Sequence, residues 1–411
     1  MKTYMSISLS CVCFFALIIL SCLPPAMAQD KQAPKDSLVI TLNMDAVYNR
    51  PFLQSGKSPI AIGGYVEVNS DYAVTDGITE GLSFHMQRLT LFMSTTIKQR
   101  IKFLTEIEFE DGTEEINIEF AALDFELHPL LVIRGGIIMI PIGAFNQNHD
   151  GPKWEFVERP LSATTIIPST WSNVGFGLHG KSYQGDWVWG YEAYLTNGFD
   201  DTIIDNEHGK TWLPATKKNP SRFEESFNGT PMSTLKTAIR HRKIGEIGLS
   251  WMGVVYNKFK DDGIIVDDKR RVDVVVVDYN KTIKQKLYIT GEWAWTFIDV
   301  PDTYSQQYGR RQTGGYTDVV FTFLKKRMLG WDNARLNASV RGEYVDYNMD
   351  EFNETESKIY DEVWGINTSL SFRPSLQTVI RVNYGYYWET DLLGNPPSKT
   401  ARIQFGFSSY F

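Results

Sequence analysis

Strict two-residue alternation between apolar and polar side chains dominates the chain from residue 60 onward. In the stretch 335–344 the apolar positions are Leu336, Ala338, Val340, Gly342 and Tyr344. The polar positions between them are Arg335, Asn337, Ser339, Arg341 and Glu343. Successive side chains of a strand point to opposite faces, so this pattern predicts a strand with one apolar and one polar face. The same split recurs at 286–297 and 376–388.

The alternating segments are about 9 to 14 residues long, against about 5 to 6 for a common strand, and this length suits a tilted strand that crosses a bilayer. The predicted strands are 60–72, 82–97, 100–110, 114–127, 130–138, 174–182, 187–197, 234–241, 245–257, 270–280, 285–297, 314–324, 332–346, 361–373, 376–388 and 398–411. Beyond the first 28 residues, no window approaches the length of a membrane-spanning apolar helix.

The connections between these strands alternate in length. The tight ones are 98–99, 128–129, 183–186, 242–244, 281–284 and 374–375. The long ones are 73–81, 139–173, 198–233, 258–269, 298–313, 347–360 and 389–397. Short periplasmic turns and long extracellular loops are typical of outer-membrane barrels. Two links depart from the pattern. The link 111–113 is short for the end with the long loops, and 325–331 is long for the end with the tight turns.

The sequence therefore predicts an all-β fold: an antiparallel transmembrane β-barrel of about 16 strands that occupies residues 60–411. Within 114–127 the apolar side chains change from even-numbered to odd-numbered positions, which predicts a β-bulge near Ala121 and Ala122. A soluble sandwich also alternates, so a secreted or surface β-sandwich binding protein is the alternative interpretation.

The N-terminus has the three parts of a secretory signal peptide: Lys2, an apolar run from Met5 to Leu20, and the small-residue ending Ala26-Met27-Ala28. We expect residues 1–28 to be the signal peptide and 29–59, a polar segment with three prolines, to be a periplasmic lead-in. Lipidation at Cys22 is the competing interpretation of the leader. All three cysteines lie within it, so the remaining chain needs no disulfide framework.

Composition and motifs exclude several function classes. The chain has 41 Lys plus Arg against 49 Asp plus Glu and a net charge of −8, which argues against a nucleic-acid partner. The six histidines lack zinc-ligand spacing, and the nucleophile motif G-x-S-x-G is absent. We therefore expect no metal, no cofactor, no catalytic residue and no enzymatic activity, with a barrel enzyme as the minor alternative.

The last strand ends on Phe411. Counting back by twos places Ser409, Phe407, Phe405 and Ile403 on the same face. This arrangement is similar to the terminal strand that the outer-membrane assembly machinery recognises, so we expect that machinery to be a partner through Phe411.

Residues 130–200 resemble the phosphate-selective porin O and P family of outer-membrane porins. The resemblance is carried by Arg134-Gly135-Gly136, Pro141-Ile142-Gly143, Phe145-Asn146, Phe156-Val157-Glu158-Arg159-Pro160, Gly175-Phe176-Gly177-Leu178 and Tyr194-Leu195-Thr196-Asn197-Gly198. Upstream, Gly64-Tyr65, Glu106 and Glu108 also fit. In order, the resemblance covers most of the mature chain, and only the 134–198 block is specific.

The resemblance implies a 16-stranded barrel of the outer membrane of a Gram-negative bacterium, usually a homotrimer, with its third long loop folded into the lumen. That loop corresponds to 139–173 here. It also implies passage of small hydrophilic solutes or anions such as phosphate, and contact with outer-membrane lipid and lipopolysaccharide. The arginine ladder and lysine cluster of the phosphate-specific members have no residue-by-residue counterpart in this chain.

If apolar faces meet lipid, the polar faces line water. Early strands would then present an acidic wall and late strands an opposite basic arc, and this transverse field would favour polar solutes. The alternative is that these charges pair across neighbouring strands and only stiffen the wall. The candidate pore-lining and constriction residues are Arg134, His149, Lys153, Glu158, Arg159, Glu106, Glu108, Arg335, Arg341, Arg381 and Arg402. We expect Pro141 and Gly143 to shape the entry of the loop.

Overall fold

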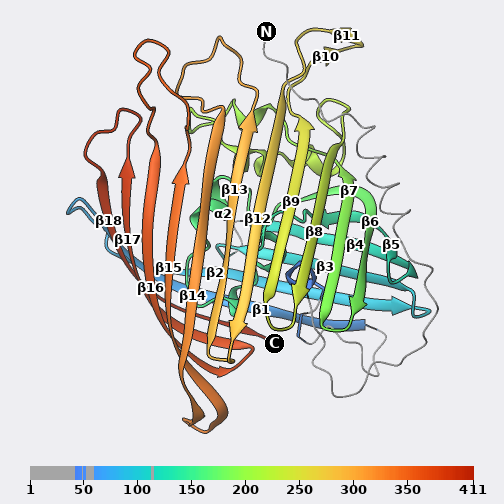
Figure 1. The fold of residues 1–411 in the computed structure, drawn as a ribbon, viewed down its shortest axis with the longest axis vertical. Helices are drawn as coiled ribbons and strands as arrows, with labels where there is room; N and C mark the ends of the chain where they lie inside the picture. Colours follow the sequence, from blue (N-terminus) through green and yellow to red (C-terminus); the bar gives the residue numbers. More distant parts are fainter. Residues whose placement is uncertain (1–41, 49, 52–59, 113–114) are drawn as a thin grey trace. The chain divides into compact units, whose positions relative to one another are not determined.

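Sixteen strands of the described chain close into one antiparallel barrel (Figure 1). The computed structural model describes residues 42–48, 50–51, 60–112 and 115–411, so the predicted signal peptide lies outside the described residues. The barrel strands are β1 (Ile60–Thr75), β2 (Leu82–Ile97), β3 (Ile101–Glu110), β4 (Glu115–His128), β5 (Leu131–Met139), β6 (Ser172–Gln184), β7 (Trp187–Thr196), β8 (Met232–His241), β9 (Gly245–Val255), β12 (Arg271–Ile283), β13 (Leu287–Ile298), β14 (Arg311–Met328), β15 (Trp331–Asp346), β16 (Glu362–Ser375), β17 (Thr378–Thr390) and β18 (Ser398–Tyr410). A separate two-stranded sheet, β10 (Lys260–Asp261) and β11 (Ile264–Ile265), lies within one of the long loops.

The barrel closes where the first strand pairs with the last. β1 and β18 are antiparallel with Tyr65 opposite Tyr410, and the backbones of Gly64 and Phe411 exchange two hydrogen bonds of 3.2 and 3.0 Å. Closure pairs both edges that an open sheet would leave free. It confirms the predicted barrel and contradicts the alternative β-sandwich, since alternation along each strand is common to both folds and only the β1–β18 pairing separates them.

The two faces of the barrel wall follow the predicted alternation. Along β15 the side chains of Asn337, Ser339, Arg341 and Glu343 are buried on the inner side, whereas Val340 on the outer side is 49% exposed. Large apolar side chains are exposed on the outside of many strands, among them Ile62, Phe176, Leu370, Ile403 and Phe405. Among the described residues, no helix has the length and apolar character needed to cross a membrane. The outer face is therefore apolar and the inner face largely polar.

The connection lengths alternate around the barrel, with tight turns at one end and longer loops at the other (Figure 1). The link predicted as 325–331 is in fact the tight turn 329–330, because β14 and β15 extend their pairing to Met328 and Trp331. The predicted bulge near Ala121 lies slightly earlier. Glu106 pairs with Phe120 and Ile107 with Ile118, so Glu119 is the extra residue.

Candidate functional site

The connection between β5 and β6, residues 140–171, packs against inward-facing side chains of the barrel, and we call it the lumen loop. Its short helix α2 (Leu161–Thr165) contacts β14 and β15, and its turn at Gly151–Lys153 contacts β1 and β18. Most of its side chains are buried although it lies outside the strands. The loop therefore fills part of the barrel interior and narrows it.

Asn146 holds the two ends of the lumen loop together. Its side-chain amide donates to the carbonyls of Ile140 (2.7 Å) and Trp171 (3.0 Å), and its side-chain oxygen accepts from the Trp171 N–H at 2.8 Å. The Ile140 N–H also donates to the Trp171 carbonyl at 2.9 Å. One buried side-chain amide thus provides hydrogen-bond partners for three backbone groups. Such partners are needed because the ends of the loop are buried away from water.

Side chains of β8, β9 and β13 hold the entry of the lumen loop. Glu292 accepts hydrogen bonds from the N–H groups of Ala144 (2.6 Å) and Phe145 (3.1 Å). The Ser250 hydroxyl accepts from the Gly143 N–H at 3.0 Å, and the Lys236 ammonium donates to the Gly143 carbonyl. Gly143 has a φ of +65°, and a Cβ there would lie 2.4 Å from a Glu292 carboxylate oxygen.

We expect the Gly143→Ala substitution to destabilise the loop entry by about 1–3 kcal/mol, because alanine tolerates neither the positive φ nor the contact with Glu292. The check is the temperature at which the folded, compact gel mobility is lost. Gly342→Ala is the matched control, since no atom lies within 4 Å of the corresponding Cβ position. Equal melting of the two variants would contradict the expectation.

The basic side chains of the late strands bind the lumen loop. Arg373 donates to the Glu155 carboxylate at 2.6 Å and to the Pro152 carbonyl at 2.8 Å. Arg381 donates to the Gly151 and Trp154 carbonyls at 3.1 and 2.8 Å. These guanidinium groups thus act as anchors for the loop backbone.

Arg341 anchors the next part of the loop in the same way. It forms a two-pronged ion pair with Asp318 at 2.6 and 2.8 Å, and it donates to the Glu158 carbonyl at 2.8 Å. Two-pronged arginine–carboxylate pairs combine strength with a fixed geometry. The predicted basic arc therefore exists, but its central arginines are engaged with carboxylates and loop carbonyls.

The acidic wall lies beside this basic arc and not opposite it, which corrects the prediction. Strands that are far apart in sequence become neighbours at the β1–β18 seam, where Arg381 of β17 donates to Glu67 of β1. Arg88 bridges Glu67 (3.1 Å) and Glu110 (2.9 Å). Charge pairing across strands, the alternative given by the sequence, thus accounts for much of the wall.

Two buried glutamates of β3 keep oxygens without hydrogen-bond partners among the described residues. Both Glu106 carboxylate oxygens and one oxygen of Glu108 are of this kind. Glu108 accepts from the Tyr65 and Thr90 hydroxyls at 3.0 Å each, and Arg159 of the lumen loop lies 3.9 Å away. Both carboxylates nevertheless lie within ion-pair distance of a guanidinium group, Glu106 at 2.8 Å from Arg50 and Glu108 at 3.6 Å from Arg88.

Residues 42–48 and 50–51, predicted as a loose lead-in, contact the inner wall and the lumen loop, and we call them the N-terminal plug. Arg50 is 3% exposed and binds Asp150 of the loop at 2.6 and 2.9 Å and Glu106 at 2.8 Å. Closer to the tight turns, the Asp45 carboxylate pairs with Lys181. The plug is thus tied to the wall at both ends.

Arg134 joins the plug to β4 and β5. Its guanidinium pairs with Asp124 at 2.7 Å, donates to the Tyr194 hydroxyl at 3.0 Å and lies over the Tyr48 ring at 3.9 Å. Arg134, which was predicted to line the pore, does face the interior. It contacts Tyr48 of the plug there and not an open channel.

The position of Asp150 links the plug, the loop and the wall electrostatically. Burial alone would raise the pKa of Asp150, but the Arg50 guanidinium and the Lys153 ammonium outweigh it and hold that pKa well below its ordinary value. Asp150 also accepts from the Tyr410 hydroxyl at 2.6 Å. The carboxylate is therefore ionised at neutral pH and keeps its charge toward Arg50.

Glu106, His149 and Asp150 offer ligand atoms within 4.8 Å of one another, a spacing that a metal ion could use. The His149 ring nitrogen Nε2 lies 3.6 Å from Glu106 and 3.8 Å from Asp150. Arg50 already supplies a positive charge to both carboxylates, so the donor set fits this guanidinium better than an added dication. The sequence analysis missed the cluster because Glu106 of β3 lies far along the chain from His149 and Asp150.

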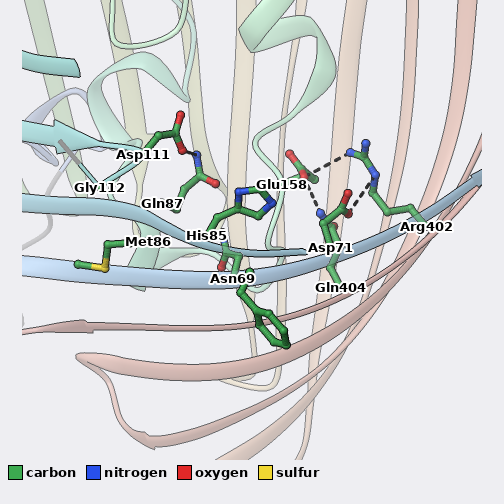
Figure 2. A pocket seen from close by; sticks show the side chains of 11 residues that line it. Asn69, Asp71, His85, Met86, Gln87, Asp111, Gly112, Glu158, Arg402 and Gln404 are labelled. Atoms are coloured by element: carbon green, nitrogen blue, oxygen red, sulfur yellow. Dashed lines mark hydrogen bonds and ion pairs between the residues drawn. The ribbon is translucent and has the colours of Figure 1, made fainter. Parts of the chain in front are cut away.

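A pocket of about 610 Å³ opens on the long-loop side of the lumen loop, and we call it the long-loop vestibule (Figure 2). It is lined by Asn69, Asp71, Phe84, His85, Met86, Gln87, Asp111, Gly112, Glu158, Arg402 and Gln404. Figure 2 shows the ion pairs of Arg402 with Asp71 and with Glu158 as dashed lines. The nitrogen–oxygen distance is 3.3 Å in each pair.

A second pocket of about 250 Å³ lies on the tight-turn side. Its lining includes Asp45 and Tyr48 of the plug together with Lys102, Asp124 and Arg134. The loop and the plug therefore stand between two polar pockets at opposite ends of the strands.

The structure distributes the predicted site residues over three places. Glu106, Arg134, His149 and Lys153 meet at the plug, and Glu158 and Arg402 line the long-loop vestibule. Glu108, Arg335, Arg341 and Arg381 lie along the wall, with Arg159 of the lumen loop beside Glu108. Arg335 is half-exposed and pairs with Arg373 in the β15–β16 register. The sequence analysis did not identify Arg50, Asp150 or Glu155 as constriction residues: Arg50 lies in the segment predicted as a lead-in, and no repeat within the loop distinguishes Asp150 and Glu155 from its other charged residues.

No family model matches the sequence. An uncharacterized protein of Aquifex aeolicus (strain VF5) is 35% identical over 149 residues, which is 34% of this chain and 33% of that protein. The chain therefore spans about a third of the length of this curated relative.

Among solved structures, an anion-selective porin from Comamonas acidovorans aligns with a TM-score of 0.55 and 11% identity, covering 86% of this chain and 99% of that chain. The Salmonella typhi OmpF complex with daunomycin aligns with a TM-score of 0.52 and 10% identity, covering 87% and 99%. Identities this low establish the fold alone. The chain thus shares the closed-barrel fold of these porins.

Proposed function

We propose that this protein is an outer-membrane porin of a Gram-negative bacterium that lets small hydrophilic solutes and ions diffuse passively. The observation that carries the proposal is the closed sixteen-stranded barrel with an apolar exterior, a charged interior and a loop inside it. A closed barrel satisfies every backbone hydrogen bond within the wall, which is what a strand-built membrane protein requires. The proposal includes no enzymatic step, cofactor or energy source.

The same proposal defines the surroundings of the protein. The exposed apolar side chains would face lipid and lipopolysaccharide at the level of the membrane. Export through the periplasm would depend on the signal peptide at 1–28, and insertion on recognition of the last strand at Phe411. Association into a homotrimer is part of the proposal and rests on the family resemblance.

The solute is the finer part of the proposal. The resemblance to the phosphate-selective family, together with the anion-selective porin of similar fold, suggests anions such as phosphate. Against this stands the engagement of Arg341, Arg373 and Arg381 with carboxylates and loop carbonyls. A chloride current blocked by low concentrations of phosphate would support the specific anion channel, and indifference to phosphate would leave a general pore.

The test of the proposed function is the swelling of liposomes that contain the purified protein. We expect swelling in uncharged sugars, with a rate that falls as the sugar becomes larger, because a water-filled constriction excludes solutes by size. Liposomes with heat-denatured protein are the control. Swelling no faster than in the control for any sugar would contradict passive diffusion.

A further inference from the structure

We propose that the long-loop vestibule is a binding site for small hydrophilic cations, above all organic ammonium ions, and that it makes the pore cation-preferring. The inference rests on the proposed function in its general form, a pore for small hydrophilic solutes and ions, and replaces the anion-specific version of it. It concerns the pocket in Figure 2, which a solute entering from the long-loop side meets before the lumen loop.

The position of the vestibule follows from the elements that line it. Asp111 and Gly112 belong to the link between β3 and β4, at the long-loop end of the barrel. His85 lies near the start of β2, directly after the loop 76–81, and Arg402 near the start of β18, after 391–397. Glu158 reaches the same pocket from the lumen loop. The vestibule therefore lies between the long-loop rim and the constriction.

The charges of the vestibule are unequal. Three carboxylates, on Asp71, Asp111 and Glu158, line it together with one guanidinium, that of Arg402. That guanidinium is shared, at 3.3 Å from Asp71 and 3.3 Å from Glu158. Asp111 accepts only a long hydrogen bond of 3.4 Å from the neutral Gln87 amide among the partners that the structure describes. Negative charge thus exceeds positive charge in the pocket.

A second observation points to a ligand that donates hydrogen bonds. Asn69 is 7% exposed, lines the vestibule, and its side-chain oxygen has no hydrogen-bond partner among the described residues. The Asp71 oxygen that pairs with Arg402 at 3.3 Å makes no hydrogen bond to it. A buried acceptor without a donor is unfavourable, so an ammonium ion that donates an N–H group to Asn69 would satisfy it.

The charges next to the vestibule are balanced. Glu67, Glu108 and Glu110 are matched there by Arg88, Arg159 and Arg381, so the excess of negative charge belongs to the vestibule itself. A polar cleft with low-dielectric walls concentrates the field of its excess charge and enriches the opposite ion. A cation would therefore be attracted into the vestibule, whereas an anion would be repelled at this entrance.

The test is the reversal potential of single channels in a KCl gradient. We expect cation preference in the wild type, and a severalfold lower cation-to-anion permeability ratio in the Asp71→Asn/Asp111→Asn/Glu158→Gln variant. Arg402→Gln should change the ratio in the opposite direction. The matched control is Glu354→Gln, an exposed carboxylate on the same rim that also accepts from a glutamine amide, Gln306. It should leave the ratio unchanged.

Three results would overturn the inference while leaving the porin intact: an anion-preferring current, a non-selective current, or a cation preference that the triple variant retains. If no current is seen, the proposed function fails, and the site is then tested by calorimetric titration of the solubilised protein with 1,4-diaminobutane. Heat of binding that disappears in the triple variant would support the site, and no heat in the wild type would overturn it.

Discussion

Replacing Arg50 with Gln is expected to release the N-terminal plug and to raise the single-channel conductance. The guanidinium of Arg50 is the cation that Asp150 and Glu106 share, at 2.6 and 2.8 Å, and it also lies 3.9 Å from the centre of the Phe92 ring. Removing one partner of a buried ion pair costs about 3–5 kcal/mol, because the remaining charge stays buried without compensation. We expect the Arg50 end of the plug to leave the wall under this penalty, while the Asp45–Lys181 pair remains.

The Arg50→Gln/Asp150→Asn double variant separates two effects of the single variant: the loss of the ion pair, and the cost of a buried carboxylate left without its partner. It removes the cation and one of the two carboxylates, so we expect it to melt at a higher temperature than Arg50→Gln and still to conduct more than the wild type. The matched control is Arg310→Gln, which breaks an exposed ion pair with Asp302. Exposed pairs contribute about 0–1 kcal/mol, so this control should change neither quantity. Wild-type conductance in both plug variants would contradict a role of residues 42–51 in blocking the lumen.

The second large effect is expected from the loop anchors. In the Arg373→Gln/Arg381→Gln variant the carbonyls of Gly151, Pro152 and Trp154 lose their donors, and Glu155 loses its ion pair. The lumen loop should then leave the wall, with a cost of about 3–5 kcal/mol from the unpaired buried carboxylates. Glu67 loses Arg381 in the same variant but keeps its pair with Arg88 at 3.1 Å.

Trypsin provides the measurement, because the lumen loop contains one bond that it can cleave, Lys153–Trp154; the bond after Arg159 precedes Pro160 and resists trypsin. We expect the loop to resist trypsin in the wild type and to be cut in the double variant, whose conductance should also become noisier. Arg335→Gln is the matched control: it neutralises the arginine opposite Arg373 on the same wall, at a half-exposed position. Resistance to trypsin in the double variant would show that other contacts are sufficient to hold the loop.

Most of the barrel could be predicted from the sequence because its signal is local. A strand with one lipid-facing and one lumen-facing side repeats every two residues, and β15, β13 and β17 follow that repeat closely. The tight turns are short enough to be located between alternating segments. The predicted bulge lies too far along the strand. The change in the alternation of apolar side chains shows only the region of the bulge, whereas the pairing with β3 determines that Glu119 is the unpaired residue.

The interior could not be predicted in the same way. The acidic and basic arcs lie far apart along the chain, and only the β1–β18 pairing makes them neighbours. Arg50 lies beside Pro51 in a polar segment without periodicity, so nothing local distinguishes it from a solvated arginine. Its partners Glu106 and Asp150 come from a strand and a loop, and their meeting depends on closure of the barrel around that loop.

The most direct test of the central claim, that this barrel is an aqueous pore partly closed by its own loop and plug, is a planar-bilayer recording of the wild-type protein beside the Arg50→Gln/Asp150→Asn variant. We predict discrete conductance steps for the wild type and larger steps for the variant. A membrane that stays silent with both proteins, although each is folded and inserted, would contradict the claim.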